Sequence, residues 1–235
     1  FTGAFLIAAV CMPARNSMFS GLWNILSQPS KISANYFDIG GYSATFLNMG
    51  LVGLACLLLF LVFRGTPNNV STLGFLLTLG FCSWGINILN MWPSIFGVMI
   101  YGLVKKEKQG SLVNAMLFST GIAPLITDLL LRYPKAEVIG FNVLGLLLAV
   151  VVGIIAGMAI SSGLGHSPNV HKGFNLYSAA LPVGVTTFFL NGMLYKVMGI
   201  ELPGASGDMA VNSWANTNIF CIALFASCII LALAL

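Results

Sequence analysis

The run LGFLLTLGFCSWGINILNMWPSIFGVMIYGLV, Leu73–Val104, is almost continuously apolar, yet two asparagines and a proline lie near its middle. As one straight helix its 32 residues would extend about 48 Å, well beyond the roughly 30 Å hydrocarbon core of a bilayer. The run must therefore tilt strongly or break. Asn87, Asn90 and Pro93 favour a break, because proline removes a backbone donor and clashes with the preceding turn. We predict a broken helix at 84–93.

The composition of the whole chain places it in a lipid bilayer. Of its 235 residues, 58% are hydrophobic and only 7% are charged, whereas about 25% of an ordinary soluble domain is charged. The sequence has no alternating strand pattern of the kind that β-barrels show. We predict an all-α integral membrane protein with about six to seven membrane segments, in one polytopic domain that covers 1–235. The segments are expected at about 1–12, 40–63, 73–104, 112–131, 138–162, 174–198 and 216–235.

A second polar interruption lies in the segment 112–131, which contains Thr120, Gly121, Pro124 and Asp128. The segment is barely long enough to cross a bilayer, so this pattern is typical of a re-entrant hairpin. A simple proline kink, packed by neighbouring helices, would account for it as well. We predict a second break near Pro124 and leave both geometries open.

Positive charge is sparse and bears on orientation. The net charge of +4 is small and the basic residues lie in short connections, so nucleic-acid binding has little support. The densest basic cluster, Lys105–Lys108, joins two apolar segments, and short lysine-rich loops tend to stay on the cytoplasmic side. We predict that this loop faces the cytoplasm.

An internal repeat is predicted from the tripeptide Tyr-Ser-Ala, which occurs at Tyr42–Ala44 and again at Tyr177–Ala179. Both copies follow a polar, glycine-containing stretch and precede an apolar segment. We infer related units at about 36–104 and 171–235, inverted in the membrane as in many transporters. The second unit lacks a counterpart of the asparagine and proline interruption. We therefore expect the chain to be a fragment of a longer protein that continues beyond both ends.

Several further patterns resemble one family of membrane proteins. They are Ser27–Ser30, Asn35–Gly41, Ala44–Leu51, Asn90–Pro93, Ala123–Pro124 and His171–Tyr177. The family is an uncharacterised prokaryotic one, known only as domain of unknown function 1576, and the resemblance covers nearly the whole chain. It implies a multi-pass protein of the inner or plasma membrane of a prokaryote. It brings no activity and no site with it.

A fainter likeness is to urea-channel proteins, whose repeats pair a broken helix of the type Asn-Pro-Ser-Gly with a helix start of the type Gly-Tyr-Asn-Ala-Thr. The stretches Asn90–Ser94 and Gly41–Thr45 resemble these two pieces. Met91 and Trp92 intervene before the proline, and Ser43 replaces the asparagine of the helix start. The likeness therefore names no solute.

Asparagines inside the apolar segments are the main candidates for a binding site. Asn87 and Asn90 are three residues apart, so they share one helix face, and at a break they would offer amides to a solute at membrane depth. Hydrogen bonding between helices is the structural alternative for both and for Asn48. The predicted pathway residues are Asn48, Asn87, Asn90, Trp92, Pro93, Tyr42, Ser43, Asn175 and Tyr177.

Two ionisable residues are further candidates. Asp128 is the one carboxylate inside an apolar segment, and Arg132 follows four residues later, well placed for an ion pair on one helix face. His171 either caps the helix that follows it or titrates in a proton-coupled step. The sequence contains no phosphate-binding, zinc or redox motif, and we predict no catalytic residue, metal or cofactor.

Together these features favour a membrane transporter or channel for a small polar solute, with its pathway at broken helices between two repeats. A membrane-embedded enzyme would need a clustered acid, base or metal set, which the sequence does not show. A non-transporting scaffold or assembly protein would need unbroken spans with seams of small residues. The expected partners are the lipid bilayer and the solute. The oligomeric state, including a homo-oligomer, stays open.

Overall fold

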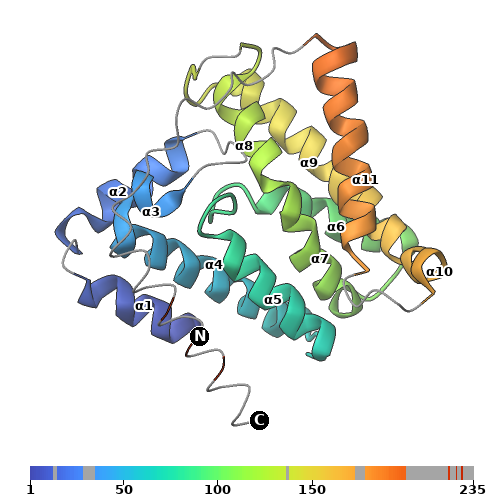
Figure 1. Ribbon diagram of the computed structural model, residues 1–235. Coiled ribbons are helices and arrows are strands. Elements are labelled where there is room, and N and C mark those ends of the chain that lie inside the picture. Colours follow the sequence, from blue (N-terminus) through green and yellow to red (C-terminus); the bar gives the residue numbers. More distant parts are fainter. Residues whose placement is uncertain are drawn as a thin grey trace. The chain divides into compact units, whose positions relative to one another are not determined.

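The computed structural model describes residues 1–12, 15–28, 35–135, 138–172 and 178–199, together with 222, 226 and 229. All secondary structure of these residues is helical, which confirms the predicted class (Figure 1). The chain divides into two compact units, Phe1–Gly204 and Ala205–Leu235. Almost all of the second unit, and with it most of the proposed repeat 171–235, lies outside the described residues. The prediction of a repeat therefore stays a prediction.

The first unit is a series of helices joined by short connections. The α-helices are α1 Thr2–Cys11, α2 Met18–Ser27, α3 Tyr36–Ile39, α4 Gly41–Phe63, α5 Asn69–Phe81, α6 Trp92–Lys105, α7 Val113–Ser119, α8 Ala123–Arg132, α9 Val143–Leu164, α10 Ser167–His171 and α11 Ala180–Asn191. Short 3₁₀ turns lie at Arg15–Ser17, Gln109–Leu112 and Thr120–Ile122, and a π-helical turn, Gly192–Val197, follows α11.

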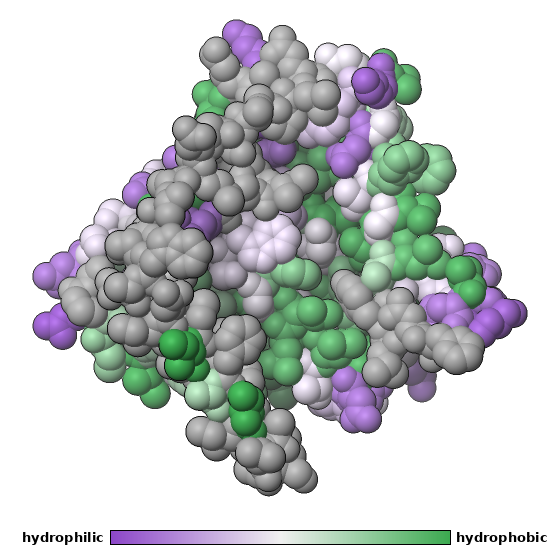
Figure 2. Space-filling model, viewed as in Figure 1, coloured by the Kyte–Doolittle hydropathy of each residue, from purple (hydrophilic) through white to green (hydrophobic). Residues whose placement is uncertain are grey.

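Three helical runs of the described residues are long and apolar enough to cross a bilayer. They are Gly41–Phe63, Gln109–Arg132 and Val143–Leu164, and a fourth would be the pair Thr2–Cys11 and Arg15–Ser27, bent by 108°, if it counts as one span. Apolar side chains on α4 and α9 are exposed, as expected for helices that face lipid. Figure 2 shows apolar residues across the middle of one face and hydrophilic residues toward its edges. The six to seven predicted spans are not reached here.

The predicted break near Pro124 needs correction. The run Gln109–Arg132 counts as one helical span of 24 residues, with a single 3₁₀ turn at Thr120–Ile122 between α7 and α8. Pro124 falls in the first turn of α8, where its missing N–H is not needed. The run Gln109–Arg132 therefore continues past Pro124 as one candidate span without a hairpin.

The break in 73–104 is confirmed, and it divides the run into two short helices. The first, α5, begins beside the start of the long span, where the Ser71 hydroxyl donates to Asn114 Oδ1 at 2.7 Å. It then runs along α7 (Figure 1), and Gly85 after its end lies against Pro124. Along its length α5 thus follows the long span in the same direction.

The second short helix, α6, returns. Near its start, Asn90 Nδ2 donates to Thr127 Oγ1 at 2.7 Å, and near its end Gly102 packs against Leu112 and the side chain of Gln109. The start of α5 and the end of α6 therefore lie at the same end of the span Gln109–Arg132. We call α5 and α6 with their connection the hairpin, its two helices the legs, and residues 82–91 its tip.

Four basic residues mark the end of the bundle from which the hairpin enters. Arg64 follows α4. The end of α4 lies at this end of the bundle, because Gly65 packs against the Gly110 carbonyl. Lys105 is the last residue of the returning leg α6, and Lys106 and Lys108 follow it. We call this end the lysine end.

The returning leg is packed closely against α9. A Cβ atom at Gly97 would lie 2.2 Å from the Ile154 carbonyl oxygen, and one at Gly157 would lie 2.1 Å from the Ser94 carbonyl oxygen. Only glycine permits this approach of two helix backbones, as small residues do in many membrane helix pairs. Pro93 likewise packs against Gly153.

Candidate functional site

The tip of the hairpin lacks regular helix, so its backbone groups need partners other than an i–4 carbonyl. Asn48, in the middle of α4, supplies three of them. Its Nδ2 donates to the Cys82 carbonyl at 3.1 Å and to the Ile86 carbonyl at 2.9 Å, and its Oδ1 accepts from the Ile88 N–H at 3.1 Å. One side chain thus fixes both sides of the tip to a spanning helix.

Asn87 and Asn90 organise the tip from within. Asn87 Oδ1 accepts from the backbone N–H groups of Leu89 and Asn90, at 3.0 and 2.9 Å. Asn90 Oδ1 accepts from the Asn87 N–H at 2.8 Å, and its Nδ2 donates to the Gly85 carbonyl at 2.9 Å as well as to Thr127. The two asparagines therefore bond reciprocally, and Asn90 joins the tip to α8.

A short helix closes over the tip. The N–H of Tyr36, the first residue of α3, donates to the Ser83 carbonyl at 2.9 Å, and Asn87 Nδ2 donates to the Tyr36 hydroxyl at 3.4 Å. Tyr36 is fully buried. Three separate segments, α3, α4 and α8, thus hold this one non-helical stretch.

The three predicted asparagines do come together. Their amide groups form hydrogen bonds with other groups of the described part of the chain. Asn48, Asn87 and Asn90 are at most 1% exposed, and each makes the hydrogen bonds given above to backbone groups of the tip. This arrangement favours the structural alternative for the amides, because they replace missing helix hydrogen bonds. Contact of these amides with a solute stays a prediction.

The other predicted pathway residues are distributed around this centre. Pro93 is buried in the first turn of α6, and Trp92 beside it is half-buried and stacks on Phe96 with ring centroids 6.0 Å apart. At the start of α4, half-buried Tyr42 packs on Phe37. Ser43 is buried, and its hydroxyl has no hydrogen-bond partner among the described residues. Asn175 and Tyr177 lie outside the described residues.

The two ionisable candidates lie on α8 and α10. Asp128 Oδ1 and Arg132 Nη1 are 3.8 Å apart on α8, and their side chains are 13% and 4% exposed, which confirms the predicted i, i+4 pair. His171 is the last residue of α10, and its ring Nε2 lies 2.8 Å from the Ser178 hydroxyl. Neither observation tests a role in proton coupling.

A pocket of about 360 Å³ lies at the lysine end between the two legs, beside α7 and the end of α9. Its polar lining residues are Glu107, Ser111, Asn114, Ser161 and Tyr101. Ser161 is 6% exposed, and its hydroxyl has no hydrogen-bond partner within the described part of the chain. We call this space the inter-leg pocket. It offers hydroxyl and amide groups to a small molecule.

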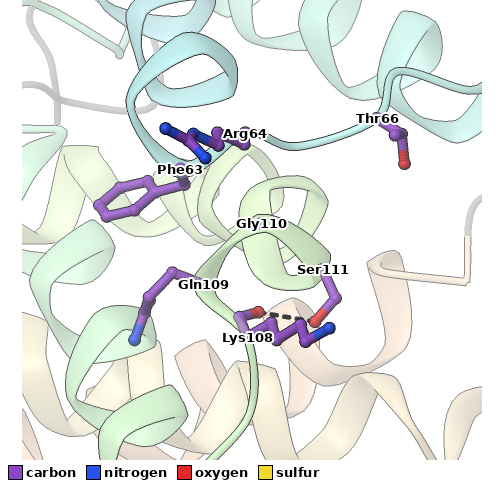
Figure 3. A pocket seen from close by; sticks show the side chains of 7 residues that line it. All are labelled: Phe63, Arg64, Thr66, Lys108, Gln109, Gly110 and Ser111. Atoms are coloured by element: carbon purple, nitrogen blue, oxygen red, sulfur yellow. Dashed lines mark hydrogen bonds between the residues drawn. The ribbon is translucent and has the colours of Figure 1, made fainter.

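A second pocket, of about 410 Å³, lies at the lysine end and is shown in Figure 3. It is lined by Phe63, Arg64, Thr66, Lys108, Gln109, Gly110 and Ser111. Arg64 and Lys108 lie on opposite sides of it, and the Ser111 hydroxyl donates to the Lys108 carbonyl at 2.7 Å. We call this space the basic pocket.

Sequence reasoning missed several residues of these sites. Thr127 and Tyr36 contact the tip from 37 and 51 residues away in the chain, and no local pattern marks such partners. Ser161 carries a weak signal, because it forms a hydroxyl pair with Ser162 in an otherwise apolar helix. Arg64 carries no signal in the sequence beyond its charge.

The family described as "Protein of unknown function (DUF1576)" matches residues 14–196. The chain belongs to this family. The matched region includes the hairpin, all helices that hold its tip and both pockets. No curated protein and no solved structure matches the chain. The residues themselves therefore carry the argument about function.

Proposed function

We propose that this protein of the DUF1576 family moves a small, uncharged polar solute across the membrane. The observation that carries the proposal is the hairpin, whose legs leave from one end of the bundle and meet in a polar, non-helical tip. Such backbone is tolerated at membrane depth only where it is buried in protein or lines a cavity. Discontinuous helices of this kind gather at the substrate sites of transporters.

The chemistry around the hairpin supports an uncharged solute. The tip carries amides and no charged side chain, and the intramembrane carboxylate of Asp128 is already paired with Arg132. The inter-leg pocket adds the Ser161 hydroxyl and the Asn114 amide close to the lysine end. Amide and hydroxyl groups both donate and accept, so they can replace water around a neutral molecule without a charge barrier.

We further propose that the protein is a multi-pass protein of a prokaryotic inner or plasma membrane, with the lysine end in the cytoplasm. The prokaryotic assignment rests on the resemblance alone. The orientation has a second support, because Arg64 is placed at the same end as Lys105, Lys106 and Lys108. Basic residues in short loops favour the cytoplasmic side.

A non-transporting scaffold is the second candidate, and one observation favours it. The tip amides of Asn48, Asn87 and Asn90 are bonded to backbone groups, so the tip can be explained as a packing device. An enzyme gains no such support, since no group of three or more His, Cys, Asp or Glu residues within the described ranges could hold a metal. A transport assay distinguishes the transporter from the scaffold.

The test is solute flux in liposomes that contain the full-length protein, measured by stopped-flow light scattering with urea and glycerol as probes. We expect permeability to at least one probe to exceed that of empty liposomes. Ser161→Leu would fill the inter-leg pocket and should reduce this flux by roughly fivefold or more, because pore diameter limits conduction. Ser162→Leu is the matched control, since Ser162 is exposed one residue further along α9, and its flux should stay at the wild-type level.

One outcome would contradict the transport proposal, and another would contradict the pathway. The first is permeability equal to that of empty liposomes for both probes. The second is flux through wild-type protein that Ser161→Leu and Ser162→Leu leave equally unchanged, which would remove the inter-leg pocket from the pathway. The first result, obtained with correctly folded protein, would favour the scaffold, whereas the second would keep transport and place its pathway elsewhere in the protein.

A further inference from the structure

We propose that the basic pocket binds the phosphate headgroup of an anionic phospholipid. Two cations from different segments line it, Arg64 directly after α4 and Lys108 after α6. Figure 3 shows Arg64 above the turn at Gly110 and Lys108 below it, with their charged ends directed away from each other, so both side chains must turn to reach one ligand. Two cations arranged around one space suit a phosphate, whose oxygens accept charge-assisted hydrogen bonds from several directions. Basic pockets between membrane helices bind lipid headgroups in this way.

The local charge balance is positive. None of the residues that line the basic pocket is a carboxylate, and Glu107, next to Lys108 in the chain, lines the inter-leg pocket instead. Thr66 adds a hydroxyl group to the lining. An anion in this pocket therefore meets two cations and a neutral hydrogen-bonding group, with no acidic side chain in the lining to repel it.

The backbone holds the two walls in place. Arg64 has a positive φ of 53° and ends α4, and the Gly65 N–H donates to the Phe60 carbonyl at 2.9 Å. Gly65 also packs against the Gly110 carbonyl. The segment that carries Arg64 is thus fixed against the segment that carries Lys108, so the backbone of the two walls is in place before a ligand arrives.

The apolar surroundings identify the source of the phosphate as a lipid. Leu61 and Val62, directly before the pocket, are 73% and 68% exposed, and Phe63 lines the pocket itself. The position at the end of a helix long enough to span places the cations where headgroups lie. A bound phospholipid would cover the exposed apolar side chains with its acyl chains, whereas a free phosphate would leave them uncovered.

The test uses the full-length protein in a neutral detergent, with thermal unfolding recorded during titration with phosphatidylglycerol, phosphatidylcholine or inorganic phosphate. A ligand that binds only the folded state raises the unfolding temperature. We expect phosphatidylglycerol to stabilise the protein at lower concentration than phosphatidylcholine, and inorganic phosphate to have little effect. In Arg64→Asn/Lys108→Gln the apparent affinity for phosphatidylglycerol should fall by roughly 25-fold, as expected for the loss of two cations near a headgroup.

The chain offers a control with the same change of charge. Lys106 has a positive φ of 57° at the end of α6, like Arg64 at the end of α4, but neither Lys106 nor Lys105 lines the pocket. Lys105→Gln/Lys106→Asn should therefore lower the affinity by less than about threefold. Lys108→Gln alone, a change at an exposed residue, gives a second measurement if the double variant does not fold.

Three results would overturn the proposal. Equal stabilisation by phosphatidylglycerol and phosphatidylcholine would exclude recognition of the anionic headgroup. Equal losses in the two double variants would indicate general surface charge and no pocket. Full stabilisation by inorganic phosphate at the same concentration would assign the site to a free anion.

Discussion

The two polar interruptions of this chain, 82–91 and 120–124, have similar compositions and opposite outcomes. Each combines glycine with small polar residues, and a proline in the first turn of the next helix follows the first (Pro93) and ends the second (Pro124). At the first, the chain leaves the helix and turns back. At the second, it tightens into one 3₁₀ turn and continues. Proline and glycine therefore do not decide between a hairpin and a span.

The difference lies in what replaces the helix hydrogen bonds. At the first interruption, Asn48 reaches backbone groups that are 34 to 40 residues away in the chain. At the second, the hydroxyls of Ser119 and Thr120 donate to the carbonyls of Met116 and Leu117, three residues back. A break at membrane depth needs donors and acceptors from outside the segment. Within the described part of the chain only the first interruption receives them from a distant asparagine, Asn48, beside the amides of its own Asn87 and Asn90.

The largest expected effect follows removal of one of these amides. Asn90→Leu keeps the volume but leaves the Gly85 carbonyl and the Asn87 N–H without the partners described above. Each buried group that loses its partner costs about 1–3 kcal/mol, so we expect a loss of about 3 kcal/mol in the free energy of unfolding. Reversible unfolding by dodecyl sulfate in mixed micelles would measure it.

The control for this substitution is Asn69→Leu, at an exposed asparagine in the first turn of α5. It should change the free energy of unfolding by less than about 0.5 kcal/mol. If Asn90→Leu proved as mild as this control, the tip would not depend on its amides, and the contrast drawn between the two interruptions would fail.

A smaller effect is expected where the two interruptions touch. A Cβ atom at Gly85 would lie 3.0 Å from Pro124 Cγ, which is closer than side chains normally pack. Gly85→Ala should therefore cost about 1 kcal/mol through overpacking. In a Pro124→Ala background the same substitution should cost less than about 0.5 kcal/mol, because the opposing ring atom is gone.

The double-mutant cycle for Gly85 and Pro124 makes this prediction specific. Additive losses would mean that the two interruptions do not press on each other through this contact. A coupling of about 0.5 kcal/mol or more would show that the hairpin tip is fitted to the 3₁₀ turn of the span.

The smallest effect is expected at the second interruption itself. Ser119→Ala/Thr120→Val removes two hydroxyls that bond only within their own helix. Such local bonds duplicate ones that the backbone already makes, so the loss should be about 0.5 kcal/mol or less. The same micelle titration checks it, and a cost equal to that of Asn90→Leu would show that the second interruption also depends on its polar side chains.

Much of the fold class could be predicted from local sequence. The length of the run 73–104 required a tilt or a break, its asparagines and Pro93 located that break, and the spacing of Asp128 and Arg132 predicted their ion pair. The return of the hairpin could not be predicted in this way. It depends on the contacts of Ser71 with Asn114 and of Gly102 with Leu112, which join residues of different helices.

The candidate site could be predicted only in part, because it too combines local patterns with contacts between different helices. Asn48, Asn87 and Asn90 stand out as amides in apolar sequence, and they do meet at the tip. Their partners do not stand out, because backbone carbonyls such as that of Gly85 carry no side-chain signal. The inter-leg pocket depends on Tyr101 of α6 and Ser161 of α9, and ordinary packing would use the same residue types.

The close approach of α6 and α9 has a mechanical consequence. Turning α6 by one residue would bring Phe96 or Val98 against the Ile154 carbonyl, where a single Cβ atom at Gly97 would already lie 2.2 Å away. Sliding is opposed in the same way, because Gly157 meets the Ser94 carbonyl and Gly153 meets Pro93. These two helices therefore behave as one rigid body. A movement of α6 would therefore carry α9 with it.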